Sequence, residues 1–230
     1  MVSMESLLLL GILAFYLFDA SLLLYADEVA FVKYGGKWSA PVGAGFMLAG
    51  RYLALPGLWS PGAPVFRSVW RAPAAEERPA VDALLAVLRP LRWPARLVAL
   101  LLFLVVPVSL LVNLAPRLML GLLGSLYLTS VLSVAYVARR RAALGLSRRD
   151  VAAIAFDVIA CPPFAINLVR RVTLRCGLGV AAGEFAAAVL DASAHTRLAG
   201  ILDARCAVMP VRADDDATPR DGADTPSAET

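Results

Sequence analysis

The sequence has little of what metal, thiol or nucleotide chemistry requires. Its 230 residues include one histidine and three cysteines, Cys161, Cys176 and Cys206. One histidine cannot supply a multi-histidine metal site, and widely spaced cysteines without a C-x-x-C pair do not form a structural zinc site. The short motifs of zinc proteases, P-loop proteins, serine hydrolases and dinucleotide-binding folds do not occur. We therefore expect no cofactor and free thiols in a reducing compartment.

The chain is also poor in charge. Charged residues make up 17% of the sequence, whereas soluble domains have roughly 25%, and apolar residues make up 60%, above the usual level of about 45–50%. This composition excludes a disordered, collagen-like or disulfide-stapled chain, and it favours an integral membrane protein over a soluble enzyme. Twenty arginines against two lysines, with abundant alanine and leucine, are typical of a GC-rich bacterial gene.

Three apolar runs are long enough to cross a membrane, whose hydrocarbon core of about 30 Å needs roughly 20 residues. They cover residues 7–25, 97–115 and 118–138, and the first contains Asp19 as its only charged residue. A cleaved signal peptide is the alternative for the first run. It is disfavoured because no lysine or arginine precedes the run and its apolar core is long. We predict an N-terminal transmembrane anchor followed by an antiparallel transmembrane hairpin.

The arginine distribution predicts the orientation of this hairpin. Nine lysines and arginines lie within residues 27–96 and twelve follow residue 138, which leaves only Arg117, in the link between the second and third spans. Positive residues near membrane spans favour the cytoplasm. We therefore predict a multi-pass protein of the bacterial inner membrane with its N-terminus outside and its C-terminus in the cytoplasm. The net charge of +4 is explained by this pattern, so we expect no nucleic-acid partner.

Between the first two spans, residues 27–71 predict a small cytoplasmic β unit. Residues 29–34 are followed by Gly35-Gly36, a typical hairpin signal, and residues 46–55 predict a second strand pair that turns at Gly50-Arg51. Residues 72–96 then form a linker with a short helix over residues 79–89. The linker ends in a group of arginines and one tryptophan that we expect at the membrane interface: Arg89, Arg92, Trp93 and Arg96.

After the third span, residues 139–208 predict amphipathic and Ala-rich cytoplasmic helices, and residues 209–230 predict a disordered acidic tail. Ser147 is a candidate helix cap, and Pro162-Pro163 should break residues 151–169 into two helices lying in the interface. A crossing or re-entrant segment is the alternative for this stretch. Further arginines are expected to meet anionic lipid headgroups: Arg139, Arg140, Arg141, Arg148, Arg149, Arg170 and Arg171.

Asp19 is the most informative single residue, because a carboxylate inside a span is costly. In the third span, small and weakly polar residues recur at every fourth position: Gly121, Ser125, Thr129 and Ser133. Such a stripe lets two helices approach closely and offers hydroxyl groups for hydrogen bonds. We predict that the first span packs on this stripe and that Asp19 is satisfied there, or by Arg92 or Arg96. A proton or ion relay is the alternative role for Asp19.

Two weaker patterns could carry chemistry. Asp191 and His195 are four residues apart on the Ala-rich helix, with Glu184 on the same side, so they could hold a metal or supply a general base. A contact on a solvated helix face is the simpler interpretation, since zinc would lack ligands. Cys161-Pro162 could bind haem, but prolines here mainly end a helix.

The sequence therefore predicts a non-catalytic accessory or scaffold protein of the inner membrane. Its contact surfaces would be the stripe, the β unit and the Ala-rich helix, and its partners would be anionic lipids together with a protein or a second copy of the chain. A small membrane enzyme acting on a lipid or headgroup is the first alternative, with Asp157, Glu184, Asp191 or His195 as candidates. A channel or transport component lined by Asp19 and Asn113 is the second.

Overall fold

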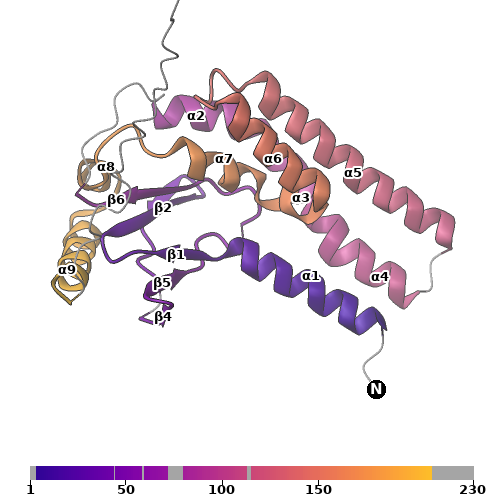
Figure 1. Cartoon of the computed structure of the whole chain (residues 1–230), viewed down its shortest axis with the longest axis horizontal. Coiled ribbons are helices and arrows are strands. Elements are labelled where there is room, and N and C mark those ends of the chain that lie inside the picture. The colour runs from indigo at the N-terminus through magenta and orange to yellow at the C-terminus, as the bar shows by residue number, and fades with distance from the viewer. Residues whose placement is uncertain (1–3, 44, 59, 72–79, 113–114, 209–230) are drawn as a thin grey trace, which may run out of the picture.

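The computed structural model describes residues 4–43, 45–58, 60–71, 80–112 and 115–208. This part of the chain is mainly helical, with two small antiparallel sheets. The predicted acidic tail and Asn113 lie outside the described residues. In Figure 1, helices α1, α4 and α5 extend side by side toward one end of the molecule, and the strands with α8 and α9 form the other end.

The elements follow one another in a simple order along the chain. The helices are α1 (Met4–Ala20), α2 (Val81–Leu88), η1 (Arg89–Leu91), α3 (Arg92–Leu100), η2 (Leu101–Val105), α4 (Val106–Leu111), α5 (Pro116–Arg139), α6 (Arg148–Ala160), η3 (Pro162–Asn167), α7 (Leu168–Cys176), α8 (Ala182–Val189) and α9 (Ala192–Val208). The strands are β1 (Leu22–Leu24), β2 (Glu28–Tyr34), β3 (Lys37–Ser39), β4 (Met47–Leu48), β5 (Arg51–Ala54) and β6 (Val65–Val69).

Two helices in the described residues are long and apolar enough to cross a membrane. One is continuous over Val81–Leu110 and comprises α2, η1, α3, η2 and α4, and the other is α5. Only 22% of the most apolar stretch of each is buried, so neither resembles the core helix of a soluble protein. A long apolar helix over the predicted residues 118–138 is confirmed as α5. The preceding helix, however, begins well before residue 97, so much of the predicted linker is helical.

The first predicted span is shorter in the structure than in the sequence interpretation. Helix α1 ends at Ala20, and Leu22–Leu24 form β1, which pairs with β5. A span continuing to residue 25 is therefore wrong, and a third full-length span is not confirmed. The chain leaves the helix because Leu24 is fully buried among β-unit residues. We call α1, the helix over Val81–Leu110 and α5 the apolar helices.

The β unit consists of two three-stranded sheets, in the orders β1-β5-β4 and β3-β2-β6. Strand β2 is buried on both faces: Val29 and Phe31 belong to the core shared with the helices, whereas Ala30 and Val32 pack with residues of the other sheet. The Gly35-Gly36 hairpin is confirmed, with positive φ at both glycines. The second turn is one residue earlier than predicted, at Ala49-Gly50, where φ is also positive.

The segment after α5 also begins as predicted. The Ser147 hydroxyl and the Asp150 carboxylate form a capping box at the start of α6, and α6 ends before Pro162-Pro163. Helix α7, which begins where the predicted interfacial stretch 151–169 ends, is mostly buried inside the protein. It packs along the edge strand β6, where the Thr173 hydroxyl donates to the Val65 carbonyl at 2.7 Å and accepts from the Val65 N–H at 3.0 Å. We call the two sheets with α7, α8 and α9 the body.

Candidate functional site

A polar cluster lies where α1 meets the body, and Asp19 is at its centre. The Asp19 carboxylate forms an ion pair with Arg171, and it accepts a hydrogen bond of 2.7 Å from the Asn167 amide. Arg171 also donates to Asp157 at 2.8 Å. We call Asp19, Asp157, Asn167 and Arg171 the Asp19 cluster. The structure thus gives Asp19 partners from η3 and α7, in place of the predicted stripe on α5 or Arg92 or Arg96.

The cluster continues along α6 and is covered by aromatic rings. Arg175 lies 4.0 Å from Asp157 and 3.6 Å from Asp150, so acidic and basic groups alternate toward the start of α6. The Arg171 guanidinium lies 3.8 Å from the centroid of the Phe164 ring, and that ring stacks on Phe15 of α1. Every carboxylate of the cluster has a basic partner, so the cluster holds α1, α6 and α7 together.

Arg170 is the neighbour of Arg171 but has a different environment. Its side chain is 4% exposed and donates to the carbonyls of Ala20 at 2.6 Å, Ser21 at 2.9 Å and Pro56 at 3.2 Å. The last carbonyls of a helix lack partners and carry partial negative charge, which a guanidinium satisfies. Desolvation by burial lowers the pKa of Arg170 to about 10, so it remains charged at neutral pH.

The prediction that Arg170 and Arg171 face lipid headgroups therefore differs from the structure. Arg170 is buried, and Arg171 is engaged by two carboxylates. The sequence interpretation missed Asn167 altogether, although an amide inside the apolar run after Pro163 was a usable signal for a buried polar contact. Near the end of α5 and the start of α6, Arg141 is half-buried and the other predicted interface arginines are exposed: Arg139, Arg140, Arg148 and Arg149.

The predicted stripe on α5 does not use its hydroxyl groups between helices. Ser125 donates to the Gly121 carbonyl at 2.9 Å, Thr129 to the Ser125 carbonyl at 2.7 Å, and Ser133 to the Thr129 carbonyl at 2.7 Å. Hydroxyl groups in helices commonly bond one turn back in this way. Gly121 and Ser125 are exposed, whereas Thr129 and Ser133 line a groove against α3.

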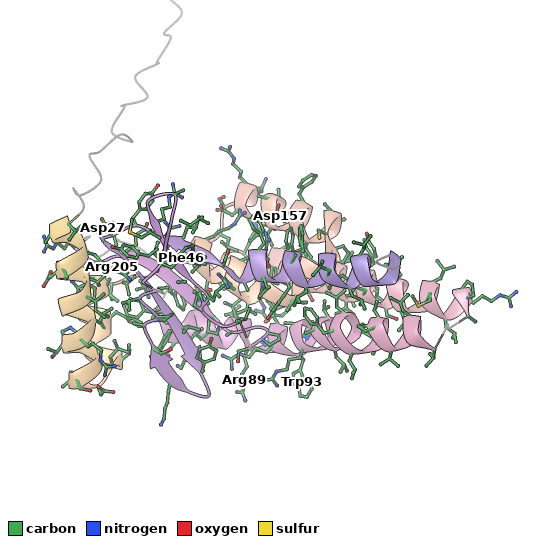
Figure 2. All side chains as sticks on the ribbon, turned by 90° about the horizontal axis from the view of Figure 1, so that it is seen from below. Asp27, Phe46, Arg89, Trp93, Asp157 and Arg205 are labelled. Carbon is green, nitrogen blue, oxygen red and sulfur yellow. The ribbon has the colours of Figure 1, made fainter. Side chains whose placement is uncertain are left out.

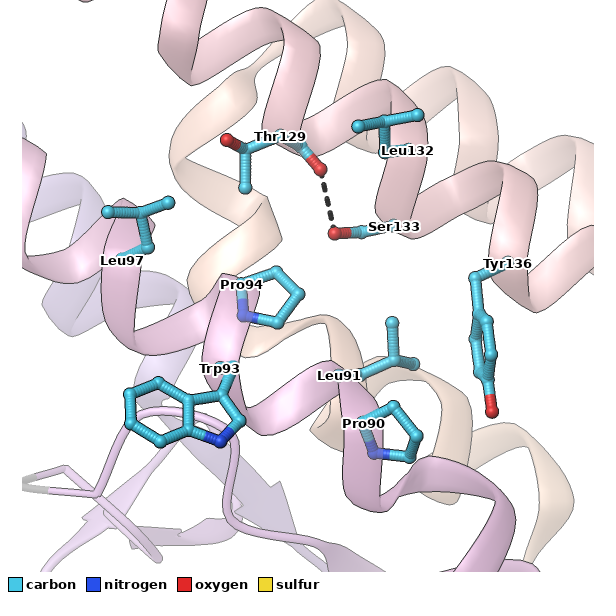
Figure 3. Close-up of a pocket in the computed structure, with 9 residues that line it drawn as sticks. All are labelled: Pro90, Leu91, Trp93, Pro94, Leu97, Thr129, Leu132, Ser133 and Tyr136. Carbon is cyan, nitrogen blue, oxygen red and sulfur yellow. Dashed lines mark hydrogen bonds between the residues drawn. The ribbon is translucent and has the colours of Figure 1, made fainter.

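This α3–α5 groove is the second candidate site (Figure 3). Its volume is about 500 Å³, and its lining is almost entirely apolar. The lining residues are Pro90, Leu91, Trp93, Pro94, Leu97, Thr129, Leu132, Ser133 and Tyr136. The Tyr136 hydroxyl donates to the Val87 carbonyl at 2.8 Å and so joins α5 to α2 at one end of the groove.

Basic and aromatic side chains flank the groove. Trp93 is 75% exposed, and Figure 2 shows it beside Arg89 on the same side of the molecule. The Arg96 guanidinium lies 5.9 Å from the centroid of a Trp93 ring. Arg89 and Arg96 are exposed and Arg92 is half-buried. Within the described residues, none of the three arginines forms an ion pair.

The residues predicted as metal ligands or a general base, Glu184, Asp191 and His195, do not form one site in the structure. The Ala-rich stretch forms two helices, and Asp191 caps the second by accepting from Ser193 and from the Ala194 N–H, both at 2.7 Å. Glu184 lies on the first of these helices, α8, and the His195 ring lies 6.2 Å from the Trp70 ring. The described residues contain no group of three or more histidine, cysteine, aspartate and glutamate side chains that could hold a metal ion.

Comparisons with protein-family models, with curated proteins and with solved structures find no match for this chain. Its function is therefore inferred from the two sites above and from the distribution of apolar and charged side chains around them.

Proposed function

We propose that this chain is an accessory or scaffold protein of the bacterial inner membrane, which anchors a cytoplasmic body through its apolar helices. The observation that carries the proposal is the exposure of large apolar side chains along all three helices. A soluble monomer rarely exposes a continuous apolar surface of this kind. Examples more than half exposed are Leu10, Phe18, Leu104, Leu118, Leu120, Leu128 and Leu132.

The distribution of charge supports the same proposal. Residues 97–138 contain a single charged residue, Arg117, at the start of α5. Helix α5 has 24 residues and is about 36 Å long at 1.5 Å per residue, enough for a hydrocarbon core of about 30 Å. Arginines gather at the opposite end of the same helices, where the body lies, which favours a cytoplasmic body.

A scaffold also needs a surface for a protein partner. In the body, Phe46, Met47 and Leu48 form an exposed apolar run at the β4–β5 hairpin. Strand β4 lies on the opposite side of the β unit from α5 (Figure 1), so we infer that a protein partner, and not lipid, covers this run. We assign this hairpin as the contact surface of the β unit.

Cysteine labelling in intact cells tests the orientation. In a variant with its three native cysteines replaced by alanine, Arg117→Cys and Lys37→Cys place single thiols at opposite ends of the molecule. A membrane-impermeant maleimide should label Arg117→Cys in intact cells and Lys37→Cys only after lysis, because only the first thiol would be outside. Labelling of Lys37→Cys in intact cells would overturn the proposal.

Gentle detergent extraction tests the scaffold role. We expect a stoichiometric protein partner or a defined homo-oligomer, measured by light scattering and mass spectrometry. The double change Met47→Ser and Leu48→Ser should release the partner while leaving the protein in the membrane, whereas Leu55→Ser, at another exposed apolar position, should not. A monodisperse monomer in the wild type would contradict a scaffold.

A further inference from the structure

We propose that the α3–α5 groove binds one acyl chain of an anionic phospholipid of the cytoplasmic leaflet, and that the arginines beside it hold the headgroup. This inference rests on the proposed membrane orientation. It goes further, because it assigns a defined lipid site to one groove, whereas general anchoring involves the whole apolar surface.

The walls of the groove fit a hydrocarbon chain. The hydroxyls of Thr129 and Ser133 are donated to carbonyls of their own helix, and that of Tyr136 is donated to Val87. No side-chain hydroxyl of the lining therefore needs a polar ligand. Leu91 and Ser133 are buried at its base. The volume of about 500 Å³ lies within the range of about 300–1,000 Å³ that ligand pockets have.

The residues around one end of the groove fit a negative headgroup. Residues 83–149 contain no aspartate or glutamate, and eight of their nine arginines lie outside the far end of α5, where Arg117 stands alone. Arg89 and Arg96 lie on the helix that carries Trp93, and Arg139 and Arg140 follow Tyr136 at the end of α5. Because the Tyr136 hydroxyl bonds to Val87, Arg89 and the arginines that end α5 are at the same end of the groove. Arg96 lies further along, next to Leu97, which lines the other end (Figure 3). Such a concentration of arginines attracts a phosphate group.

The exposed indole of Trp93 favours lipid over an apolar helix of another protein. Trp93 lies one turn after Arg89, with Arg96 one turn further on, and its ring is 75% exposed at the rim of the groove. Tryptophan and arginine together are typical of the headgroup level of a bilayer. An acyl chain in the groove would place its headgroup at this level.

Photo-crosslinking of the full-length protein in vesicles tests the site. The probe is phosphatidylglycerol with a diazirine in one acyl chain, in vesicles of phosphatidylcholine. We expect saturable labelling of peptides that contain residues 90–97 and 129–136, and competition by unlabelled phosphatidylglycerol but not by phosphatidylcholine. Even labelling along all exposed faces of the apolar helices would overturn the proposal, since that pattern is bulk lipid contact.

Matched variants separate the groove from its surroundings. Thr129→Phe fills the groove and should abolish the saturable labelling, whereas Leu128→Phe, on an exposed position of the same helix outside the lining, should leave it unchanged. Arg89→Gln and Arg96→Gln should each weaken competition about fivefold, as expected for one arginine near an anionic surface. Arg117→Gln, at the opposite end, should have no effect. Unchanged labelling in Thr129→Phe would overturn the inference.

The same experiment distinguishes the two proposals. Resistance of the protein to alkaline carbonate extraction reports whether it is integrated in the membrane. A protein that is extracted by carbonate contradicts the proposed function itself. A protein that stays in the membrane without saturable labelling contradicts only the lipid site, and crosslinks from the groove to a copurified protein would assign the groove to a protein partner instead.

Discussion

The body and the apolar helices use the same kinds of side chain in opposite ways. In the body, Phe31 and Phe66 are fully buried between sheet and helices, whereas Phe18 on α1 is 74% exposed and Leu120 on α5 is 68% exposed. The body therefore has a hydrophobic core of its own. The apolar helices expose surface that is unfavourable in water and needs an apolar cover, which we propose to be the bilayer.

The two regions also differ in where their charged side chains lie. The charges of the Asp19 cluster and the guanidinium of Arg170 lie at the junction, where α1 joins the body. The charged residues of α5, Arg117 and Arg139, are at its two ends. Buried polar groups are tolerated when they are hydrogen-bonded. At the junction the carboxylate of Asp19 and the guanidinium of Arg170 have specific partners, whereas the buried Nε of Arg171 has none among the described residues. The following substitutions test this difference, from the largest expected effect to the smallest.

Removing the guanidinium of Arg170 should have the largest effect on the free energy of unfolding. Arg170→Ala removes the guanidinium that bonds three carbonyl groups, two of them on buried residues, and we expect a loss of about 4 kcal/mol. The measurement is denaturant unfolding of the purified protein in detergent micelles. Arg149→Ala, which removes an exposed arginine, is the control and should change stability little. Equal losses in both variants would show that Arg170 does not hold the junction.

A charge in the middle of α5 should disturb membrane insertion. Leu128→Arg places an arginine on an exposed position near the centre of this helix, at an expected cost of about 3 kcal/mol. The integrated fraction after carbonate extraction should fall accordingly. Val208→Arg, on a more exposed apolar position in the body, is the control and should leave integration unchanged. If both variants integrate like the wild type, the two regions do not differ as proposed.

Breaking one ion pair of the Asp19 cluster should have a smaller effect. Asp19→Asn removes one of the two carboxylates of Arg171, while Asp157 remains, so we expect a loss of about 2 kcal/mol in unfolding free energy. Asp82→Asn removes a highly exposed partner of Lys33 and should cost almost nothing. Normal stability of Asp19→Asn together with loss of a proton-coupled activity would instead favour the relay role of this residue.

The capping box of α6 should give the smallest effect, and it depends on pH. Ser147→Ala should lower the unfolding free energy by about 1 kcal/mol. The hydrogen bond from Ser147 holds the pKa of Asp150 below its ordinary value. The charged carboxylate therefore stabilises the folded protein above the ordinary aspartate pKa of about 3.9, and this contribution is lost as the pH falls through the lower, folded value.

The pH dependence provides the check on this cap. Wild type and Ser147→Ala should differ most in unfolding free energy at neutral pH, and the difference should narrow as the solution is acidified through the pKa of Asp150. The bond from the Asp150 N–H to the Ser147 hydroxyl does not titrate and should keep part of the difference. Ser125→Ala, whose hydroxyl bonds only within α5, should follow the wild-type pH profile. A constant difference between wild type and Ser147→Ala at every pH would exclude the contribution of the carboxylate.

Local patterns were sufficient to predict much of the secondary structure. The apolar run of α5, the Gly35-Gly36 hairpin, the Ser147 cap and the break at Pro162-Pro163 each depend on neighbouring residues, and each was predicted correctly. The end of α1 was predicted too late, because the leucine-rich sequence continues past the last residue of the helix. What ends α1 there is a contact with β5, about thirty residues further along the chain.

The partners of the charged residues could not be predicted from the sequence. Asp19 stands 148 residues before Asn167 and 152 before Arg171. Arg170 and Arg171 are adjacent and chemically identical, yet one bonds carbonyl groups and the other carboxylates. Helix geometry directs successive side chains about 100° apart, so only the packing of α7 against α1 and β6 decides which arginine meets which group.

By itself, the sequence determined where the long apolar segments lie and where the arginines are concentrated, because both depend only on composition along short segments. It also determined the turns and caps, whose conformations are set within a few residues. The tertiary structure alone decided that Asp19 is paired, that Arg170 is buried, and that two helices leave a groove beside those arginines. These features need residues from distant segments to meet, and close packing of the whole chain brings them together.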